Sequence, residues 1–201
     1  ASALMQGLAD GYFVLPYTIG DYLADDIQTG AIDTQSAEFD EAEKAVREKL
    51  ERLMSGSGTH SVDYYHKKLG KIMWNKCGMS RNAKELQEAI DEIAALRKDF
   101  YENVRIPGTV DTKNQELEKA GRVADFLELG ELFAVDALNR NESCGGHFRE
   151  EYQTEDGEAL RDDENYRYVA AWEFKGEPKD AVLHKEELVY ENIELKTRSY
   201  K

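Results

Sequence analysis

Residues 82–108 constrain the fold more than any other part of this chain. Their apolar side chains recur every three or four positions, which places them on one face of an α-helix. Asn82 followed by Glu85 resembles a capping box at the start of this helix, and Pro107 with Gly108 ends it. Because the other face is charged, the helix is stable only when its apolar face packs against other helices. The stripe consists of Leu86, Ile90, Ile93, Leu96, Phe100 and Val104.

Three further segments repeat this period and are predicted to pack with the first as a helical bundle. They cover residues 36–55, residues 61–78 and a long helix that opens at Thr112, where Gln115 completes a second capping box. The second half of the long helix, residues 126–138, is apolar on most sides and is predicted to be buried on most sides. The predicted core positions are Phe39, Ala42, Val46, Leu50 and Leu53, then Val62, Tyr65, Leu69, Ile72 and Met73, and finally Leu117, Val123, Leu127, Leu132 and Val135.

The N-terminal segment, residues 1–34, is rich in glycine, alanine and aromatic residues. Ala3, Gly7 and Gly11 lie four positions apart, so on a helix they form a face that permits close packing against another backbone. The remainder of the chain offers no evident partner for this face. Because the sequence also begins at Ala1 without a methionine, we expect it to be a piece of a longer protein.

The helical region is assigned to residues 35–140, and the periodicity fades in residues 141–201. Residues 153–165 read as a polar, acidic loop. Residues 166–174 and 188–195 are predicted to be strands, because they are rich in aromatic and β-branched residues. The fold class is therefore mainly α, with a small extended or β region at the C-terminus.

Composition excludes several classes of function. The chain has 41 acidic and 26 basic residues, a net charge of −15, which disfavours binding to nucleic acid or anionic lipid. Its two cysteines, Cys77 and Cys144, are far apart and provide no disulfide framework, which favours a reducing compartment such as the cytoplasm. No apolar stretch approaches the roughly 20 residues that a membrane-spanning helix needs.

The stretch Cys144-Gly145-Gly146-His147 admits three interpretations. Cys144 and His147 could form a thiolate–imidazole pair, although such pairs usually join residues that are distant in the chain. They could supply two metal ligands, but a closed zinc site needs four, and no second pair has matching spacing. The interpretation that the residues favour is a turn at the two glycines, with Cys144 packed as a small apolar residue. We therefore predict neither a catalytic residue nor a metal ligand in this chain.

Other residues that could carry chemistry have simpler explanations. The carboxylate pairs Asp25-Asp26 and Asp162-Asp163 are expected to be solvated surface in so acidic a chain. Trp74 and Trp172 are expected to pack in the core or at an interface. The sequence contains no glycine-rich nucleotide-binding motif, zinc-protease motif or nucleophile-elbow motif.

The segment ASALMQGLADGYFVLPYTIGDYLA, residues 1–24, is similar to the last flavin-contacting stretch of the flavoprotein subunit of succinate dehydrogenase and fumarate reductase. Residues 142–147, Glu-Ser-Cys-Gly-Gly-His, then residues 162–166 and the basic, aromatic residues 198–201 follow the order of motifs at the family's C-terminus. Cys144 stands where many members have arginine, which resembles the branch called B-type.

The resemblance implies a three-helix, spectrin-repeat-like bundle in the C-terminal third of a larger subunit. Residues 1–34 would then be the terminal segment of the FAD-binding domain, and Ser2, Ala3 and Leu4 would contact the cofactor FAD. The whole enzyme would interconvert succinate and fumarate by hydride transfer at the flavin, with catalytic residues upstream of Ala1 and this fragment inactive alone. Its partners would be an iron–sulfur subunit and, through it, a membrane cytochrome b or quinone subunit on the inner face of the cell membrane. The alternative is an independent helical protein-interaction module.

Overall fold

A computed structural model describes residues 2–196 of the chain, and side-chain burial from residue 3. The chain divides into two compact units, Ala1–Ala45 and Val46–Lys201, and the boundary falls inside helix α4 (Ala37–Met54). The predicted C-terminal motif at residues 198–201 lies outside the described residues. The described part is mainly helical with one two-stranded sheet, which confirms the predicted fold class.

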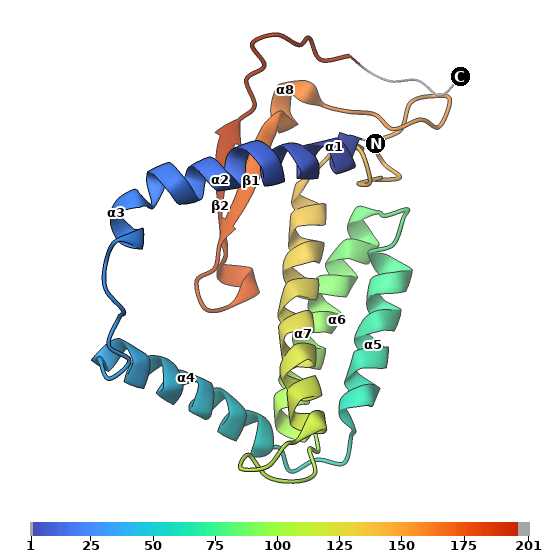
Figure 1. Ribbon diagram of the computed structural model, residues 1–201. Coiled ribbons are helices and arrows are strands. Elements are labelled where there is room, and N and C mark those ends of the chain that lie inside the picture. The colour runs from blue at the N-terminus through green and yellow to red at the C-terminus, as the bar shows by residue number, and fades with distance from the viewer. Residues whose placement is uncertain (1, 197–201) are drawn as a thin grey trace. The chain divides into compact units, whose positions relative to one another are not determined.

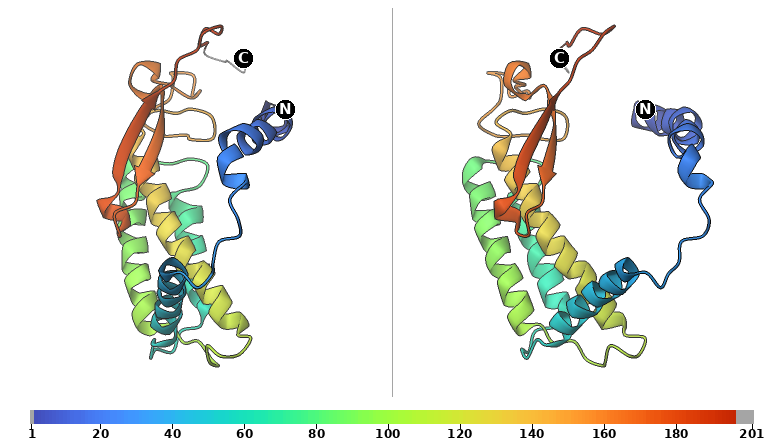
Figure 2. Two further views of the ribbon diagram at one scale, coloured as in Figure 1. Left: turned by 60° about the vertical axis from the view of Figure 1, so that its left-hand side comes forward. Right: turned by 90° about the vertical axis from the view of Figure 1, so that its left-hand side faces the viewer.

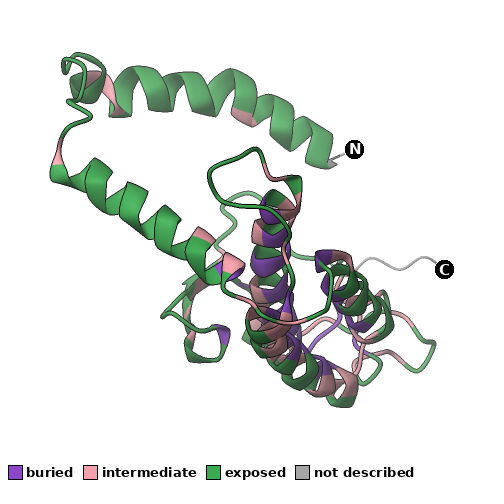
Figure 3. Cartoon of the chain, turned by 90° about the horizontal axis from the view of Figure 1, so that it is seen from below, coloured by how far each residue is buried: buried purple, intermediate pink, exposed green. Residues whose placement is uncertain are grey.

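The first unit is a helical rod followed by a turn and the start of α4 (Figure 1). None of residues 3–45 is buried, so this unit has no core of its own, and Figure 3 shows its ribbon almost entirely in the colour of exposed residues. Apart from its chain neighbours and its own helix backbone, a Cβ atom placed at Gly7 or Gly11 would meet no atom within 4 Å, so the predicted close packing of this face has no partner within this unit. The rod comprises α1 (Ser2–Ala9), η1 (Asp10–Val14), α2 (Leu15–Tyr17), η2 (Thr18–Tyr22) and α3 (Ala24–Ile27).

The second unit contains a three-helix bundle of α5 (Val62–Lys76), α6 (Ala83–Asn103) and α7 (Gln115–Asn139), seen from two sides in Figure 2. A side-chain cap starts each helix by accepting a hydrogen bond from a backbone N–H three residues on. Asn82 caps α6 as predicted. The cap of α7 is Asn114, so the prediction of Thr112 was wrong by two residues. Asn114 is favoured because its amide also donates to the carbonyl of Pro107 at 2.8 Å, which fixes the preceding loop.

The bundle core contains most of the predicted stripe positions. Its fully buried members come from all three helices and include Tyr65, whose hydroxyl donates to the Asp99 carboxylate at 3.0 Å. The end of α4 adds Leu53. Burial of this apolar surface at about 25 cal/mol per Å² is the main favourable contribution to folding. The core cluster is Leu53, Val62, Tyr65, Leu69, Ile72, Cys77, Leu86, Ala89, Ile93, Leu96, Phe100, Val104, Leu117, Ala120, Val123, Ala124, Leu127, Ala134 and Ala137.

Several predicted burials were wrong. Phe126, Leu129 and Phe133 in the second half of α7 are exposed, Leu129 by 61%. They flank the buried face of α7, and the Phe126 ring lies 5.9 Å from the His66 ring of α5 at the edge of the bundle. Trp74 is 84% exposed, which excludes the core position predicted for it, whereas the alternative of an interface position stays a prediction. In α4, the predicted core residues Phe39, Ala42 and Val46 are exposed, because the buried contacts of α4 begin only near its C-terminal end.

An antiparallel hairpin follows the bundle, formed by β1 (Tyr168–Glu173) and β2 (Val182–Glu187). A four-residue helix α8 (Asp163–Tyr166) precedes it, and a 3-10 turn η3 (Pro178–Asp180) lies between its strands. The strand predicted at residues 166–174 is confirmed, whereas the strand predicted at 188–195 was wrong, because β1 pairs with the more polar segment before it. Among the described residues, no helix is both long and apolar enough to cross a membrane.

Candidate functional site

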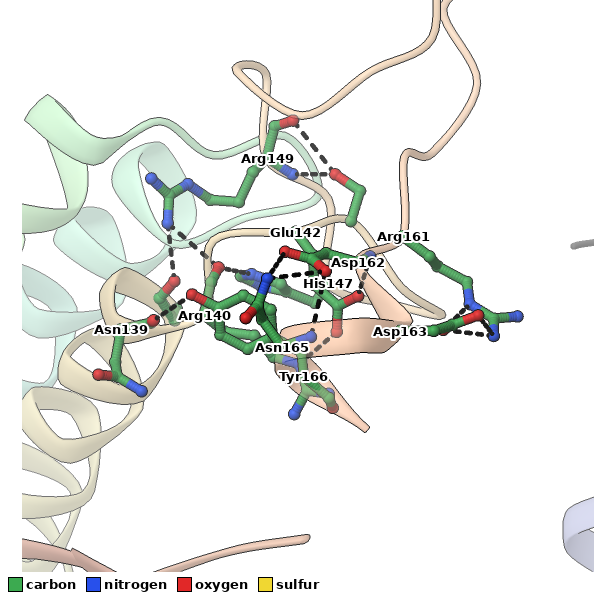
Figure 4. A network of polar contacts seen from close by, with 12 residues as sticks. Asn139, Arg140, Glu142, His147, Arg149, Arg161, Asp162, Asp163, Asn165 and Tyr166 are labelled. Carbon is green, nitrogen blue, oxygen red and sulfur yellow. Dashed lines mark hydrogen bonds and ion pairs between the residues drawn. The ribbon is translucent and has the colours of Figure 1, made fainter. Parts of the chain in front are cut away.

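The C-terminal end of α7 is held by a buried arginine from the loop that follows it (Figure 4). Arg149 is only 2% exposed, and its Nη1 donates to the carbonyl oxygens of Ala137 at 3.1 Å and Leu138 at 3.2 Å. These carbonyls have no partner within the helix, and a cation is favoured at this end of the helix dipole. The Arg149 Nε donates to Glu151 at 3.1 Å. The guanidinium is therefore both hydrogen-bonded and charge-paired, as burial requires.

The loop between α7 and Arg149 contains the Cys144-Gly145-Gly146-His147 turn. The backbone N–H of Cys144 donates to the His147 carbonyl at 2.8 Å, and the reverse bond is 3.0 Å. Gly145 has φ +60°, a left-handed conformation that glycine adopts at little cost. The predicted role of the glycines as a turn is confirmed.

The imidazole of His147 is held at both nitrogens. Its Nε2 lies 2.9 Å from the carbonyl oxygen of Arg140, and its Nδ1 lies 3.0 Å from Nη1 of Arg81. A carbonyl only accepts and a guanidinium only donates, so the ring must be the neutral tautomer with its proton on Nε2. Burial lowers the pKa of His147 below the usual 6.5, and the nearby charges of Arg81, Arg149 and Arg140 lower it further.

This arrangement decides how the thiol and the imidazole relate. A general base needs a free nitrogen lone pair directed at the proton that it accepts. The lone pair of His147 Nδ1 is directed at Arg81, so it is not available to Cys144. The geometry therefore supports the turn, and His147 does not act as a base for Cys144.

A buried carboxylate joins the acidic loop to the end of α7. Glu142 is 2% exposed and accepts from Nε of Arg140 at 2.8 Å and from the backbone N–H of Asp162 at 2.8 Å. Asp162 in turn caps α8, and Asp163 is paired with Arg161. The expectation of a simply solvated Asp162-Asp163 pair was therefore wrong, because both carboxylates are half-buried and hold the loop in place. Asp25 and Asp26 are exposed as expected.

A small surface pocket opens beside His147. The Arg81 guanidinium lies 5.0 Å from the ring centroid of Phe133 at its wall, and Asp136 accepts the indole N–H of Trp172 at 2.7 Å. The pocket offers arginine donors and one aromatic surface to a ligand. The lining residues are Arg81, Phe133, Asp136, Ala137, Arg140, Cys144, Gly146 and His147. No cluster of His, Cys, Asp or Glu in the described part could hold a metal ion.

The predicted flavin contacts lie in the other unit. Ser2, Ala3 and Leu4 begin α1, and Ala3 and Leu4 are exposed, Leu4 by 76%. They remain a prediction, since nothing in the described part of the chain encloses them.

Sequence reasoning singled out His147 and Cys144 but missed the residues that hold them. The glycine turn is flanked in the sequence by Glu142, Ser143 and Arg149. Charged and polar residues so close to the end of a buried helix could have predicted a polar network there. Ser143 Oγ accepts from the N–H of Arg149 at 2.8 Å. Arg81 lies 66 positions before His147, and no local pattern connects the two.

Comparison with known proteins places this arrangement in a family. Residues 66–200 match the family model described as fumarate reductase flavoprotein C-term. The chain is 29% identical over 151 residues to the succinate dehydrogenase flavoprotein subunit of Bacillus subtilis (strain 168), an alignment that covers 75% of this chain and 25% of that protein. It is 31% identical over 153 residues to the fumarate reductase flavoprotein subunit of Haemophilus influenzae, covering 76% and 24%.

A solved structure gives the same assignment. A chain of the Mycobacterium smegmatis Sdh1 complex in the apo form matches with a TM-score of 0.64 and 26% identity, over 82% of this chain and 26% of that chain. The present chain therefore spans about a quarter of the length of these relatives. With a matching family model over residues 66–200 and the bundle in place, this chain belongs to the fumarate reductase flavoprotein C-terminal family.

Proposed function

We propose that this chain forms the C-terminal part of an FAD-containing flavoprotein subunit that interconverts succinate and fumarate. The observation that carries the proposal is the family match over residues 66–200, at about a quarter of the length of relatives named for these two activities. The flavin and the dicarboxylate then bind chiefly to residues outside this chain, and the chain alone does not turn over substrate.

The described residues do not by themselves fit a flavin. A cofactor of that size needs a concave site that encloses most of its surface. Ser2, Ala3 and Leu4 offer backbone N–H groups at the start of α1, but Leu4 is largely exposed and Ala3 has no hydroxyl. We assign these residues an edge contact, made through the backbone, to a flavin held elsewhere.

The exposed apolar surface of the rod supports the proposal that the flavin binds mainly to residues outside this chain. A segment without a core that exposes so much apolar surface is typical of a piece that packs on another surface. We propose that residues 1–34 complete the flavin domain, residues 35–140 form the bundle, and residues 141–201 form its extended closing region. The exposed side chains are Leu4, Met5, Leu8, Tyr12, Phe13, Val14, Leu15, Tyr17, Ile19 and Tyr22.

The partners follow from the same proposal. An iron–sulfur subunit would accept electrons from the flavin and pass them to a membrane cytochrome b or quinone subunit. This places the chain on the inner face of the cell membrane as a peripheral component. We retain the B-type assignment as part of the proposal, because Cys144 replaces the arginine that many members have.

A reconstitution experiment tests the proposal. This chain is produced alone and together with a polypeptide that supplies the remainder of a flavoprotein subunit, and succinate-dependent dye reduction is measured in both. We expect activity and bound flavin only in the combined preparation. Flavin retained by the chain alone, or failure of the combined preparation to bind flavin while both parts are folded, would favour the independent interaction module.

A further inference from the structure

Three arginines surround His147, and they differ in how their charges are balanced. Arg140 is paired with Glu142 at 2.8 Å, and Arg149 is paired with Glu151 at 3.1 Å. Arg81 has no carboxylate within ion-pair distance among residues 2–196. Its Nε donates to the Gly78 carbonyl at 2.8 Å and its Nη1 meets His147, and both of these partners are neutral.

An uncompensated guanidinium at this place is unusual. The chain carries 41 acidic residues against 26 basic ones, so a counter-charge is easily supplied. Half-burial lowers the pKa of Arg81, because its charge has lost part of its hydration and no carboxylate in the described part of the chain pairs with it. The nearest wall of the pocket is the Phe133 ring, which lies beside the guanidinium and limits its orientation.

Two of the arginines that line this pocket have a guanidinium nitrogen without a hydrogen bond. Among the described residues, Nη2 of Arg81 and Nη1 of Arg140 make no hydrogen bond, and both residues line the pocket beside His147. From this geometry we propose that the pocket formed by Arg81, Arg140 and Phe133 binds a carboxylate group.

A carboxylate fits this pocket better than a phosphate dianion. Its two oxygens match the planar fork of a guanidinium, which binds carboxylates through paired charge-assisted hydrogen bonds. Asp136 also lines the pocket and repels a second negative charge, so a singly charged, planar anion is favoured. The carboxylate is either a small free anion or the side chain of another polypeptide segment that covers this end of the bundle.

Binding is tested on this chain by titration with sodium acetate at constant ionic strength. The ring nitrogen resonances of His147 are followed by NMR, because Arg81 contacts Nδ1 directly. We expect a saturable shift and a rise in the pKa of His147, because the bound anion offsets the positive charges of Arg81 and Arg140 while Arg149 and Asp136 stay unchanged.

Variants assign the effect to the guanidinium. Arg81→Gln should weaken acetate binding about tenfold or more, since charge-assisted hydrogen bonds are lost. Arg81→Lys keeps the charge but loses the planar fork of the guanidinium, so on a logarithmic scale it should lose about half as much acetate affinity as Arg81→Gln. The lysine variant also provides the test if the glutamine variant does not fold. Arg105→Gln, at an exposed site away from the pocket, should bind as the parent chain does.

To distinguish a free anion from a carboxylate side chain, the titration is repeated on a complete flavoprotein subunit that contains this chain. This part of the experiment rests on the proposed function. Saturation by acetate in both preparations assigns a free anion. Saturation only in the present chain assigns a carboxylate side chain that already fills the pocket in the complete subunit. A shift that does not saturate in this chain, or equal affinity in Arg81→Gln, overturns the proposal.

Discussion

Replacing Arg149 by methionine tests the polar network at the end of α7 most sharply. The change keeps much of the side-chain length and removes the donors to the Ala137 and Leu138 carbonyls. Hydrogen bonds that involve a charged group contribute about 1.5–3 kcal/mol each, so losing these two costs about 3–6 kcal/mol. Burial of the methionine side chain offsets this by about 1 kcal/mol, and the net loss is therefore about 2–5 kcal/mol. Glu151 is 38% exposed and can be rehydrated, so it adds little.

The measurement is the free energy of unfolding from urea denaturation, followed by far-UV circular dichroism. An unchanged slope with denaturant shows that only stability has changed. Arg105→Met is the matched control, because the Arg105 side chain is exposed, and its effect should stay within about 0.5 kcal/mol. A loss below about 1 kcal/mol for Arg149→Met, typical of a surface ion pair, would refute the assignment of Arg149 as a buried helix cap.

Three further predictions concern the turn. Because the folded-state pKa of His147 lies below 6.5, the unfolded chain binds more protons as the pH falls, so His147 contributes stability above pH 6.5 that is lost at lower pH. In His147→Gln this part of the pH dependence of the free energy of unfolding should be absent. If the free energy of unfolding of the variant changes with pH as that of the parent chain does, the prediction is wrong. Gly145→Ala should cost about 1 kcal/mol because its φ is +60°, whereas Gly146→Ala, where φ is not positive, should cost under about 0.5 kcal/mol. Equal effects of the two alanines in thermal denaturation would contradict this account. Cys144→Ser should change the free energy of unfolding by less than about 1 kcal/mol, and a larger loss in urea denaturation would show that the thiol does more than fill space.

The bundle could be predicted from the sequence because local signals and tertiary packing agree there. The apolar stripe of α6 and its Asn82 cap specify a helix without reference to any other segment. The cap of α7 could not be placed so well, since Thr112 and Asn114 are both good capping residues. The choice depends on the hydrogen bond from Asn114 to Pro107, seven residues earlier.

Long-range pairing explains the remaining errors. Strand β2 is largely exposed and polar, so only its hydrogen bonds with β1 mark it as a strand. The contact of Arg81 with His147 joins two segments that are 66 residues apart, and no local sequence pattern in either segment predicts the contact. The apolar residues Phe126 and Phe133 of α7 are exposed. Their burial was predicted wrongly because a hydrophobic side chain favours burial without indicating which surface covers it.

Hydrogen exchange of residues 2–22 tests whether the N-terminal rod depends on another surface for its stability. This rod has no core of its own, whereas α5, α6 and α7 share a core. We propose that the rod packs on the remainder of a flavoprotein subunit. In the isolated chain, amides of residues 2–22 should exchange rapidly while those of α6 are protected, and addition of the remainder of the subunit should protect residues 2–22. Protection of residues 2–22 in the isolated chain equal to that of α6, or no gain of protection in a flavin-containing complex, would contradict the account.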